Sequence, residues 1–375
     1  MLNSLLILIF IRPFISSLAF PEVNLIYSIL LLGFLGIWLV LKGLPLKEIK
    51  PIKYPLILLC VALIISVVFS QNKLNSLLEL YKYISGMLLF LIAISLTHEN
   101  KIRVIRAIIL ASLIISLLAI YQYFFGFKQL LNYIVREKIT DPFVLDYVER
   151  KRVFFPFVTP NTLAGYFALI IPLVLIIQDK SRWLVLSTIS FALLLTKSLG
   201  AFLSIFLTLI IYSYLEGKLK RKRILFIISL SIIFAFLFII RSATQKQHFR
   251  PIFSTVMRIN YWKDTLSIIK ASPLTGVGLG NFNLMQSRYT HNSYSQIWAE
   301  MGILGIVSIL WFITAVFKSA LKNMKDSVHK NITASLVSAN SVFLIHNFVD
   351  FTFFLPEVAL IWWVILGLIL SQILL

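Results

Sequence analysis

The chain has 375 residues, of which 59% are apolar and only 13% are charged, and its formal net charge is +20. Its mean hydropathy of +0.92 is far above that of a soluble domain, whose surface needs many more charged side chains. The composition therefore excludes a soluble globular protein. Because the apolar runs are continuous rather than alternating, it predicts an all-α polytopic membrane protein and not a barrel.

Apolar runs long enough to cross a bilayer, which takes about 20 residues, recur along the whole chain. Arg12 interrupts the first run and no charged segment precedes it, so we interpret this run as a span and not as a signal peptide. We predict twelve spans, at residues 2–20, 23–41, 54–70, 83–97, 107–126, 157–178, 183–197, 199–216, 224–240, 301–317, 332–349 and 355–375.

The loops predict how these spans are oriented. If the N-terminus is cytoplasmic, all the inner connections are short and basic, as the positive-inside rule requires. This predicts an N-in/C-in topology with spans 1–5 in residues 1–126, spans 6–9 in 157–240 and spans 10–12 in 301–375. The two long loops, residues 127–156 and 241–300, then lie outside, and we expect both to fold over the outer face because both are rich in aromatic and β-branched residues.

Few residues are available for a metal or redox centre. Cys60 is the single cysteine, and the five histidines form no HxxxH pair. We expect no metal, no cofactor and no nucleic-acid partner.

The outer loops are rich in cations. A cation-rich pocket at a membrane surface suits an anionic ligand such as a lipid-linked phosphate or pyrophosphate, because guanidinium groups bind phosphate oxygens in pairs. The alternative is attraction to anionic membrane lipids. The cations in or beside these loops are Arg150, Lys151, Arg152, Arg241, Lys246, Arg250, Arg258, Lys263, Lys270 and Arg288.

Within the larger loop, "STVMRINYWKDTLSIIKASP" predicts an amphipathic helix at the membrane interface. Its apolar residues Ile259, Trp262, Leu266 and Ile269 recur at intervals of three, four and three. Arg258, beside this stripe, either points into a cavity between the spans or extends to the lipid surface. The run "GVGLG" that follows predicts a tight turn with close backbone approach, and less readily a phosphate cradle.

The stretch "SRYTHNSYSQIWAEMGILG" places polar residues at the start of a span. With Thr290 or Asn292 as the N-cap, polar and aromatic side chains fall on two stripes that a lipid-facing helix would not need. His291 is either a capping or interfacial histidine or a base that takes a proton from an attacking hydroxyl. A second polar cluster, His346, Asn347 and Asp350, is expected at a similar depth, where it either supports the same cavity or ties helices together.

Four segments in this order resemble the O-antigen ligase and polymerase superfamily of bacterial inner-membrane glycosyltransferases. They are "PFVTPNTLAGYFAL" after a basic residue, "LLTKSLGAFLS", "RINYWKDTLSIIKASPLTGVGLGNF" and "THNSYSQIWAEMGILG". The likeness covers roughly residues 150 to 315. It implies transfer of a glycan from undecaprenyl pyrophosphate to a sugar hydroxyl, on lipid A core for a ligase or on another lipid-linked glycan for a polymerase.

The resemblance also implies roles for particular residues. Arg258 matches the loop arginine that binds the pyrophosphate, and His291 matches the histidine proposed as base or acceptor-orienting residue. Where family ligases often have an arginine in an "SRGA"-like motif, this chain has Leu199 in "KSLGA", and Lys197 is the nearest cation. The further residues expected to bind the pyrophosphate or glycan are Arg152, Arg250, Lys197, Asn292, Tyr294 and Arg288.

A secondary transporter is the alternative from another class. Transporters usually have internal repeats and polar or broken helices at mid-membrane. Here the two halves differ and the polar clusters lie at the predicted outer ends of the spans, which favours the enzyme.

Overall fold

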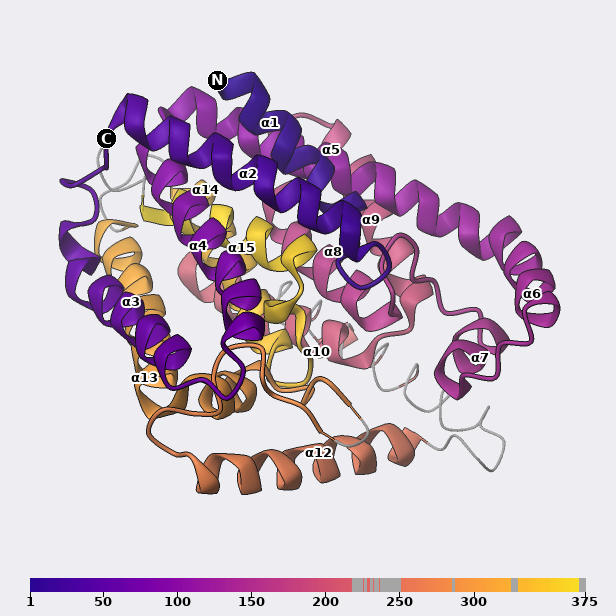
Figure 1. Ribbon diagram of the computed structural model, residues 1–375. Helices are drawn as coiled ribbons and strands as arrows, with labels where there is room; N and C mark the ends of the chain where they lie inside the picture. The colour runs from indigo at the N-terminus through magenta and orange to yellow at the C-terminus, as the bar shows by residue number, and fades with distance from the viewer. Residues whose placement is uncertain are drawn as a thin grey trace.

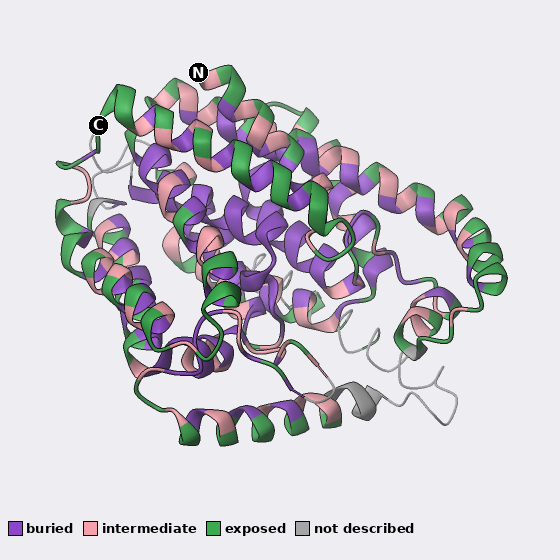
Figure 2. Ribbon diagram, viewed as in Figure 1, coloured by how far each residue is buried: buried purple, intermediate pink, exposed green. Residues whose placement is uncertain are grey.

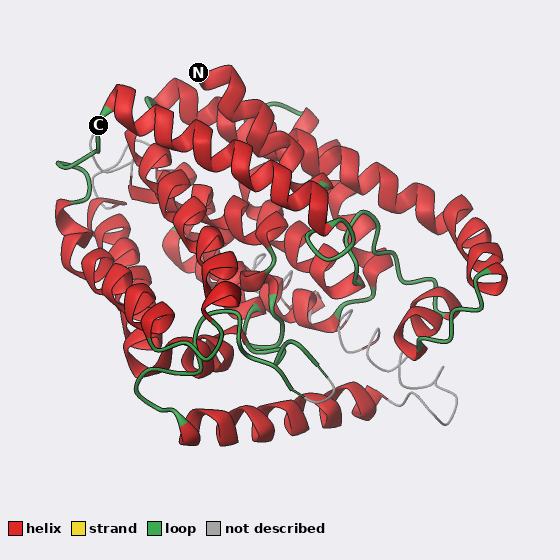
Figure 3. Ribbon diagram, viewed as in Figure 1, coloured by secondary structure: helices red, strands yellow, loops and turns green. Residues whose placement is uncertain are grey.

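A computed structural model of the chain describes residues 1–217, 251–284, 287–324 and 330–370 and the isolated positions 225, 228, 229, 232 and 236 (Figure 1). Of the described residues 79% are helical, and none of them lies in a strand (Figure 3). The all-α class is thereby confirmed.

Eleven of the predicted spans coincide with helices in the described part of the chain, and most of the predicted span 224–240 lies outside it. The corresponding helices are α1 (Leu2–Ile11), α2 (Pro21–Lys42), α3 (Lys53–Val68), α4 (Lys73–Ser95), α5 (His98–Tyr121), α8 (Pro160–Val174), α9 (Ser181–Thr196), α10 (Leu199–Leu215), α13 (Ser293–Met324), α14 (Lys330–His346) and α15 (Pro356–Leu370). The long loops form α6 (Phe127–Arg136), α7 (Pro142–Glu149) and α12 (Pro251–Ala271).

Not all of these helices are long enough to cross a membrane on their own. Five described segments meet that criterion by length and composition, and five shorter apolar helices of 10–17 residues accompany them. The five are Pro21–Lys42, Lys50–Val68, Lys73–Ser95, His98–Arg136 and Ser293–Lys322. The count of twelve spans and the N-in/C-in orientation stay predictions.

The core of the bundle forms around α15, whose residues from Pro356 to Leu370 are all buried. It packs mainly against α4, while α13 packs against α3, and α14 lies between α8 and α10. A helix that is apolar on every side requires such a position. By contrast, α2 exposes apolar residues along one side, as expected of a helix at the lipid boundary (Figure 2).

The helix α13 is interrupted near its start, and the preceding loop fills the gap. Gly302 has φ 67° and ψ −169° inside the helix. The backbone amides of Val277 and Gly278 donate to the carbonyl oxygens of Ala299 and Glu300, at 2.9 and 3.0 Å. A Cβ on Gly276 would lie 2.5 Å from the Glu300 carbonyl oxygen. The close backbone approach predicted for "GVGLG" is therefore confirmed.

Replacing Gly302 by alanine is expected to destabilise the protein. A Cβ there would lie 2.0 Å from the Leu274 carbonyl oxygen, and the positive φ adds strain of roughly 1–3 kcal/mol. We expect Gly302→Ala to lower the thermal unfolding midpoint in detergent. The control is Gly33→Ala in α2, where a Cβ has nothing within 4 Å. Equal melting of the two variants would contradict this account of the break.

Candidate active site

The N-terminus of α13 is fixed to the turn that follows α14. The Ser293 backbone amide donates to the Asn347 carbonyl oxygen at 2.9 Å. The Ser293 hydroxyl donates to Asn347 Oδ1 at 2.6 Å and lies 3.2 Å from the Asp350 carbonyl oxygen. The Asn347 amide group donates to Phe343 O and Thr352 Oγ1, at 2.8 and 2.9 Å. Two segments far apart in sequence are thus held in one fixed arrangement.

Asn292, one of the two cap candidates in the sequence, caps α13. Its Oδ1 accepts from the backbone amides of Tyr294 and Ser295, both at 3.1 Å, while the Thr290 hydroxyl oxygen accepts from the Asn292 amide at 3.1 Å. His291 lies between these two capping residues with φ 56°, a left-handed conformation that is uncommon outside glycine. The cap therefore imposes the direction in which the His291 side chain leaves the backbone.

The imidazole of His291 lies between α12 and the turn after α14. It stacks on Tyr261 with ring centroids 6.0 Å apart, and the Phe351 ring meets it edge-on at 4.8 Å. Its Nδ1 is buried and has no hydrogen-bond partner among the described residues. Burial lowers the pKa of His291 to about 4, with the Asp350 charge acting to raise it and the Arg258 charge to lower it further. His291 is therefore neutral at pH 7 and able to accept a proton.

Arg258 lies in α12, one turn before Tyr261 on the same side of the helix. It is half-buried and forms no hydrogen bond or ion pair with the described residues. Its charge acts on both His291 and Asp350. A guanidinium so placed keeps all its donors available for an anion. The two residues predicted to be catalytic are thus brought into one electrostatic environment.

The helix α12 lies across one end of the bundle, here called the α12 end (Figure 1). Tyr261 and Ile269 are buried in a small apolar cluster with Phe282, Leu284 and Ala299, which holds α12 against α13. The predicted apolar stripe divides, since Ile269 is 5% exposed but Ile259 and Leu266 are 41% and 51% exposed. The side of α12 with Arg258, Tyr261 and Ile269 packs against the bundle. The other apolar residues of the stripe face outward, as in an interfacial helix.

Asp350 adds a buried carboxylate to this site. It is 1% exposed, and its Oδ2 lies 3.2 Å from His346 Nε2. Although burial raises its pKa, the neighbouring His346, His291 and Arg258 together lower the pKa of Asp350 below its usual value. An ionised Asp350 near a neutral His291 stabilises any positive charge that develops on the imidazole. The polar cluster after α14 therefore belongs to the same site as His291.

The cations predicted near residue 150 gather at the end of α9. Arg152 is 6% exposed and donates to Thr196 O at 3.1 Å and Asn161 Oδ1 at 3.0 Å. Lys197 Nζ donates to Arg150 O at 2.6 Å. Partial burial and then the charges of Arg152, Arg150 and Lys151 lower the pKa of Lys197. These cations have protein partners, and a role in substrate binding stays a prediction.

Leu199 begins α10 directly after this cluster. A Cβ on Gly200 would lie 3.6 Å from the His346 ring, so the "KSLGA" segment lies beside the turn that carries Asp350. The position at which family ligases have an arginine is therefore close to the site, although its charge is missing here.

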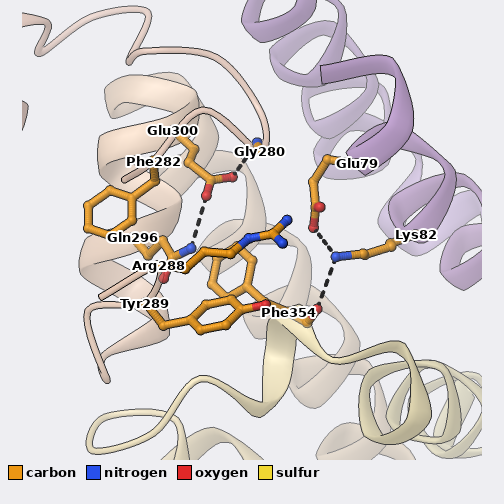
Figure 4. Close-up of a pocket in the computed structure, with 9 residues that line it drawn as sticks. All are labelled: Glu79, Lys82, Gly280, Phe282, Arg288, Tyr289, Gln296, Glu300 and Phe354. Atoms are coloured by element: carbon orange, nitrogen blue, oxygen red, sulfur yellow. Dashed lines mark hydrogen bonds and ion pairs between the residues drawn. The ribbon is translucent and has the colours of Figure 1, made fainter. Parts of the chain in front are cut away.

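Tyr294 and Arg288 form no hydrogen bond or ring contact with His291 within the described part of the chain. The Tyr294 hydroxyl donates to Leu344 O at 2.8 Å and its ring packs against Phe348, so it ties α13 to α14. Arg288 is exposed and lines a cleft with residues of α4 (Figure 4). Arg250 lies outside the described residues.

Two charged residues in α4 were missed by the sequence analysis. Glu79 and Lys82 form an ion pair of 2.6 Å inside α4, with side chains only 8% and 17% exposed. The predicted span begins at residue 83, directly after these two charges. The E-x-x-K spacing of Glu79 and Lys82 beside an apolar run could have indicated that both charges lie inside the helix, since charges within a membrane helix are rare and commonly paired.

Asn347→Ala is expected to disturb the site. It removes four hydrogen bonds of a buried amide and leaves its partners unsatisfied, which costs roughly 2–5 kcal/mol. We expect a lower unfolding midpoint and a loss of any activity that depends on His291. The control is Asn340→Ala within α14, because the buried Asn340 side chain makes a single hydrogen bond with the described residues, to Leu336 O. Similar losses in both variants would contradict the anchoring role of Asn347.

No curated protein matches the chain significantly. The sequence model of the family described as O-Antigen ligase matches residues 183–310, a segment that contains Arg258 and His291. Residues 183–310 therefore match the O-antigen ligase family, and the resemblance noted in the sequence is confirmed over that segment.

Proposed function

We propose that this protein is a glycosyltransferase of O-antigen ligase type. It moves a glycan from undecaprenyl pyrophosphate to a sugar hydroxyl of lipid A core, at the periplasmic face of the inner membrane and without a metal. The observation that carries the proposal is that a neutral His291, a buried Asp350 and Arg258, which pairs with none of the described residues, share one environment at the α12 end of the bundle. Arg258 and His291 both lie within the segment that matches the O-antigen ligase family.

The proposed reaction is an inverting displacement at the anomeric carbon. The acceptor hydroxyl oxygen forms a bond to that carbon while the bond from the carbon to the pyrophosphate oxygen breaks. The hydroxyl proton passes to His291, and the electron pair of the broken bond leaves with the undecaprenyl pyrophosphate. The imidazolium then releases its proton to water.

Each residue of the site has a part in this scheme. Arg258 stabilises the charge that grows on the departing pyrophosphate, as a preorganised cation does in a water-poor site. Asp350 stabilises the imidazolium that forms on His291. His291 stacks on Tyr261 and meets Phe351 edge-on, and these contacts fix the ring, so that the base needs little rearrangement in the transition state.

A polymerase of the same superfamily is the second candidate. The specific observation in its favour is Leu199, which stands next to the site where family ligases often have an arginine. The two activities differ in the acceptor, and reconstitution with one lipid-linked donor and the two acceptors offered separately distinguishes them. A lipid or saccharide transporter is less well supported, because the two halves of the chain differ and only the second carries the long loop 241–300.

His291→Ala should retain normal membrane expression and lower the transfer rate by roughly 10²–10⁴-fold, the usual contribution of a general base. In the unaltered protein, kcat/KM for the donor should stay level from pH 8 to about pH 5 and fall below that. The sign follows from the pKa of about 4, since the neutral imidazole is the active form and acid protonates it. An acid limb near pH 6.5, or unchanged transfer by His291→Ala, would contradict the assignment. His98→Ala, at the start of α5, is the control.

Arg258→Ala should raise the donor KM and lower kcat, by on the order of 10–100-fold in kcat/KM. Arg258→Lys should recover only part of this loss, since lysine keeps the charge but not the paired donors. Steady-state kinetics with varied donor provide the measurement. Lys263→Ala, on the exposed side of the same helix, should behave as the unaltered protein. A lysine variant that is fully active would show that Arg258 acts only as a diffuse charge.

A further inference from the structure

His346, the last residue of α14, is a buried histidine that has no part in the reaction scheme above. Its Nε2 lies 3.2 Å from Asp350 Oδ2, and its Nδ1 has no hydrogen-bond partner among the described residues. Buried polar groups in a folded protein nearly always face a partner. The group that the His346 ring faces is the Asp350 carboxylate.

Two glycines from different helices make room for the His346 ring. A Cβ on Gly165 of α8 would lie 2.7 Å from both Cδ2 and Nε2 of His346. A Cβ on Gly200 of α10 would lie 3.6 Å from Cε1 and 3.7 Å from Nδ1. A core packed this closely leaves the ring little freedom to turn. The helices α8 and α10 therefore hold Nε2 toward Asp350.

The Asp350 carboxylate is held at both of its oxygens. Its Oδ1 accepts from the Phe351 amide at 2.7 Å, and His346 is the group near its Oδ2 within the described part of the chain. The titratable and charged groups that interact with Asp350 there are His346 of α14, His291 before α13, Arg258 of α12 and Tyr147 of α7.

The chemistry of a carboxylate sets what His346 does. An ionised carboxylate accepts hydrogen bonds and donates none, so the ring nitrogen that faces Asp350 carries a hydrogen. Without this neighbour, burial would favour the neutral acid form of Asp350. A neutral Asp350 would not stabilise the positive charge that forms on His291.

We propose that His346 is a positioning residue of the transfer reaction, which keeps Asp350 ionised and oriented so that Asp350 can stabilise the imidazolium of His291. The proposal rests on the function proposed above and extends it to a residue that acts through another. The hydroxyl proton still passes to His291, and His346 keeps its own proton throughout. The segments "PFVTPNTLAGYFAL" and "LLTKSLGAFLS" thereby gain a part in the site, because they supply Gly165 and Gly200.

The first test measures donor kinetics of the full chain in lipid nanodiscs as a function of pH. We expect His346→Ala to lower kcat by roughly 10–100-fold while the donor KM stays within about twofold. The acid limb of kcat/KM should move up by about one pH unit or more, because the ionised form of Asp350 is the active one and it would take a proton more readily. His346→Gln, whose amide N–H can replace Nε2, should recover most of the rate and the original limb.

A substitution in α8 tests the same contact without changing the histidine. Gly165→Ala should displace the ring and move the acid limb as His346→Ala does. Gly36→Ala in α2, where a Cβ has nothing within 4 Å, is the matched control and should behave as the unaltered protein. If His346→Ala does not fold, His346→Leu fills the same space without a donor and should give the same shift of the limb.

A double-mutant cycle separates positioning from a merely structural role. If His346 acts through Asp350, the variant with both His346→Ala and Asp350→Asn should be no slower than Asp350→Asn alone. Losses that multiply in the double variant, or an acid limb that His346→Ala leaves in place, would overturn the proposal.

The titration of His291 provides a readout that needs no transfer. In ¹⁵N-histidine NMR spectra, assigned by comparison with His291→Gln, His291 should take up its proton at a lower pH in His346→Ala, because it loses the charge of Asp350. An unchanged titration of His291 in an active protein would overturn the proposal. A lowered titration in a protein that transfers no glycan to any acceptor would support the coupling of the two histidines through Asp350 and refute the glycosyltransferase function.

Discussion

The site depends on a set of buried hydrogen bonds that join the start of α13 to the turn after α14. Asn347 is 2% exposed, and it is bonded to Ser293, Phe343, Thr352 and Phe353. In a bundle surrounded by lipid, an unsatisfied polar group costs several kcal/mol, so these partners must remain together. Their geometry fixes His291 on one side of the junction and Asp350 and Phe351 on the other. The helix α12 completes the site by adding Arg258 and Tyr261.

The distribution of charge divides the surroundings of His291 into two regions. On the α12 side Arg258 supplies a cation that pairs with none of the described residues, whereas the surface near Tyr289 carries two carboxylates, Glu79 and Glu300, and two cations, Lys82 and Arg288. A site that transfers a glycan from an anionic donor to a neutral acceptor requires a cationic side for the donor and a side without excess charge for the acceptor. The lowered pKa of His291 suits this arrangement. It keeps the imidazole neutral, and so able to act as a base, beside the permanent positive charge of Arg258.

The sequence was sufficient to predict the helical class, the positions of most helices, a cap at Thr290 or Asn292 and the close approach at "GVGLG". These features follow from apolar runs and from local backbone chemistry, both of which depend on residues that are close together in the sequence. Arg258 and His291 were selected by motif and position. Their common electrostatic environment with Asp350 came from the structure, since Asp350 is more than fifty residues from either and only the fold brings it close.

Other features depend on partners that no local pattern identifies. Arg152 and Tyr294 were grouped with the substrate-binding residues from their position alone, whereas the structure shows the backbone carbonyls of Thr196 and Leu344 as their partners. The start of α4 at Lys73 rather than residue 83 depends on the Glu79–Lys82 pair, which allows two charges to enter an apolar bundle. The side of α12 that faces the bundle depends on Tyr261 packing with Phe282 and Ala299, which are distant in sequence.

The central claim is that a lipid-linked pyrophosphate binds between Arg258 and His291, with the anomeric carbon of its glycan facing the imidazole. An experimental structure of the protein with an undecaprenyl-pyrophosphate-linked glycan bound tests this most directly. The account predicts phosphate oxygens in contact with the Arg258 guanidinium and the first sugar beside His291 and Phe351. A donor bound along a path through the middle of the bundle, or bound with its pyrophosphate away from α12, would contradict it.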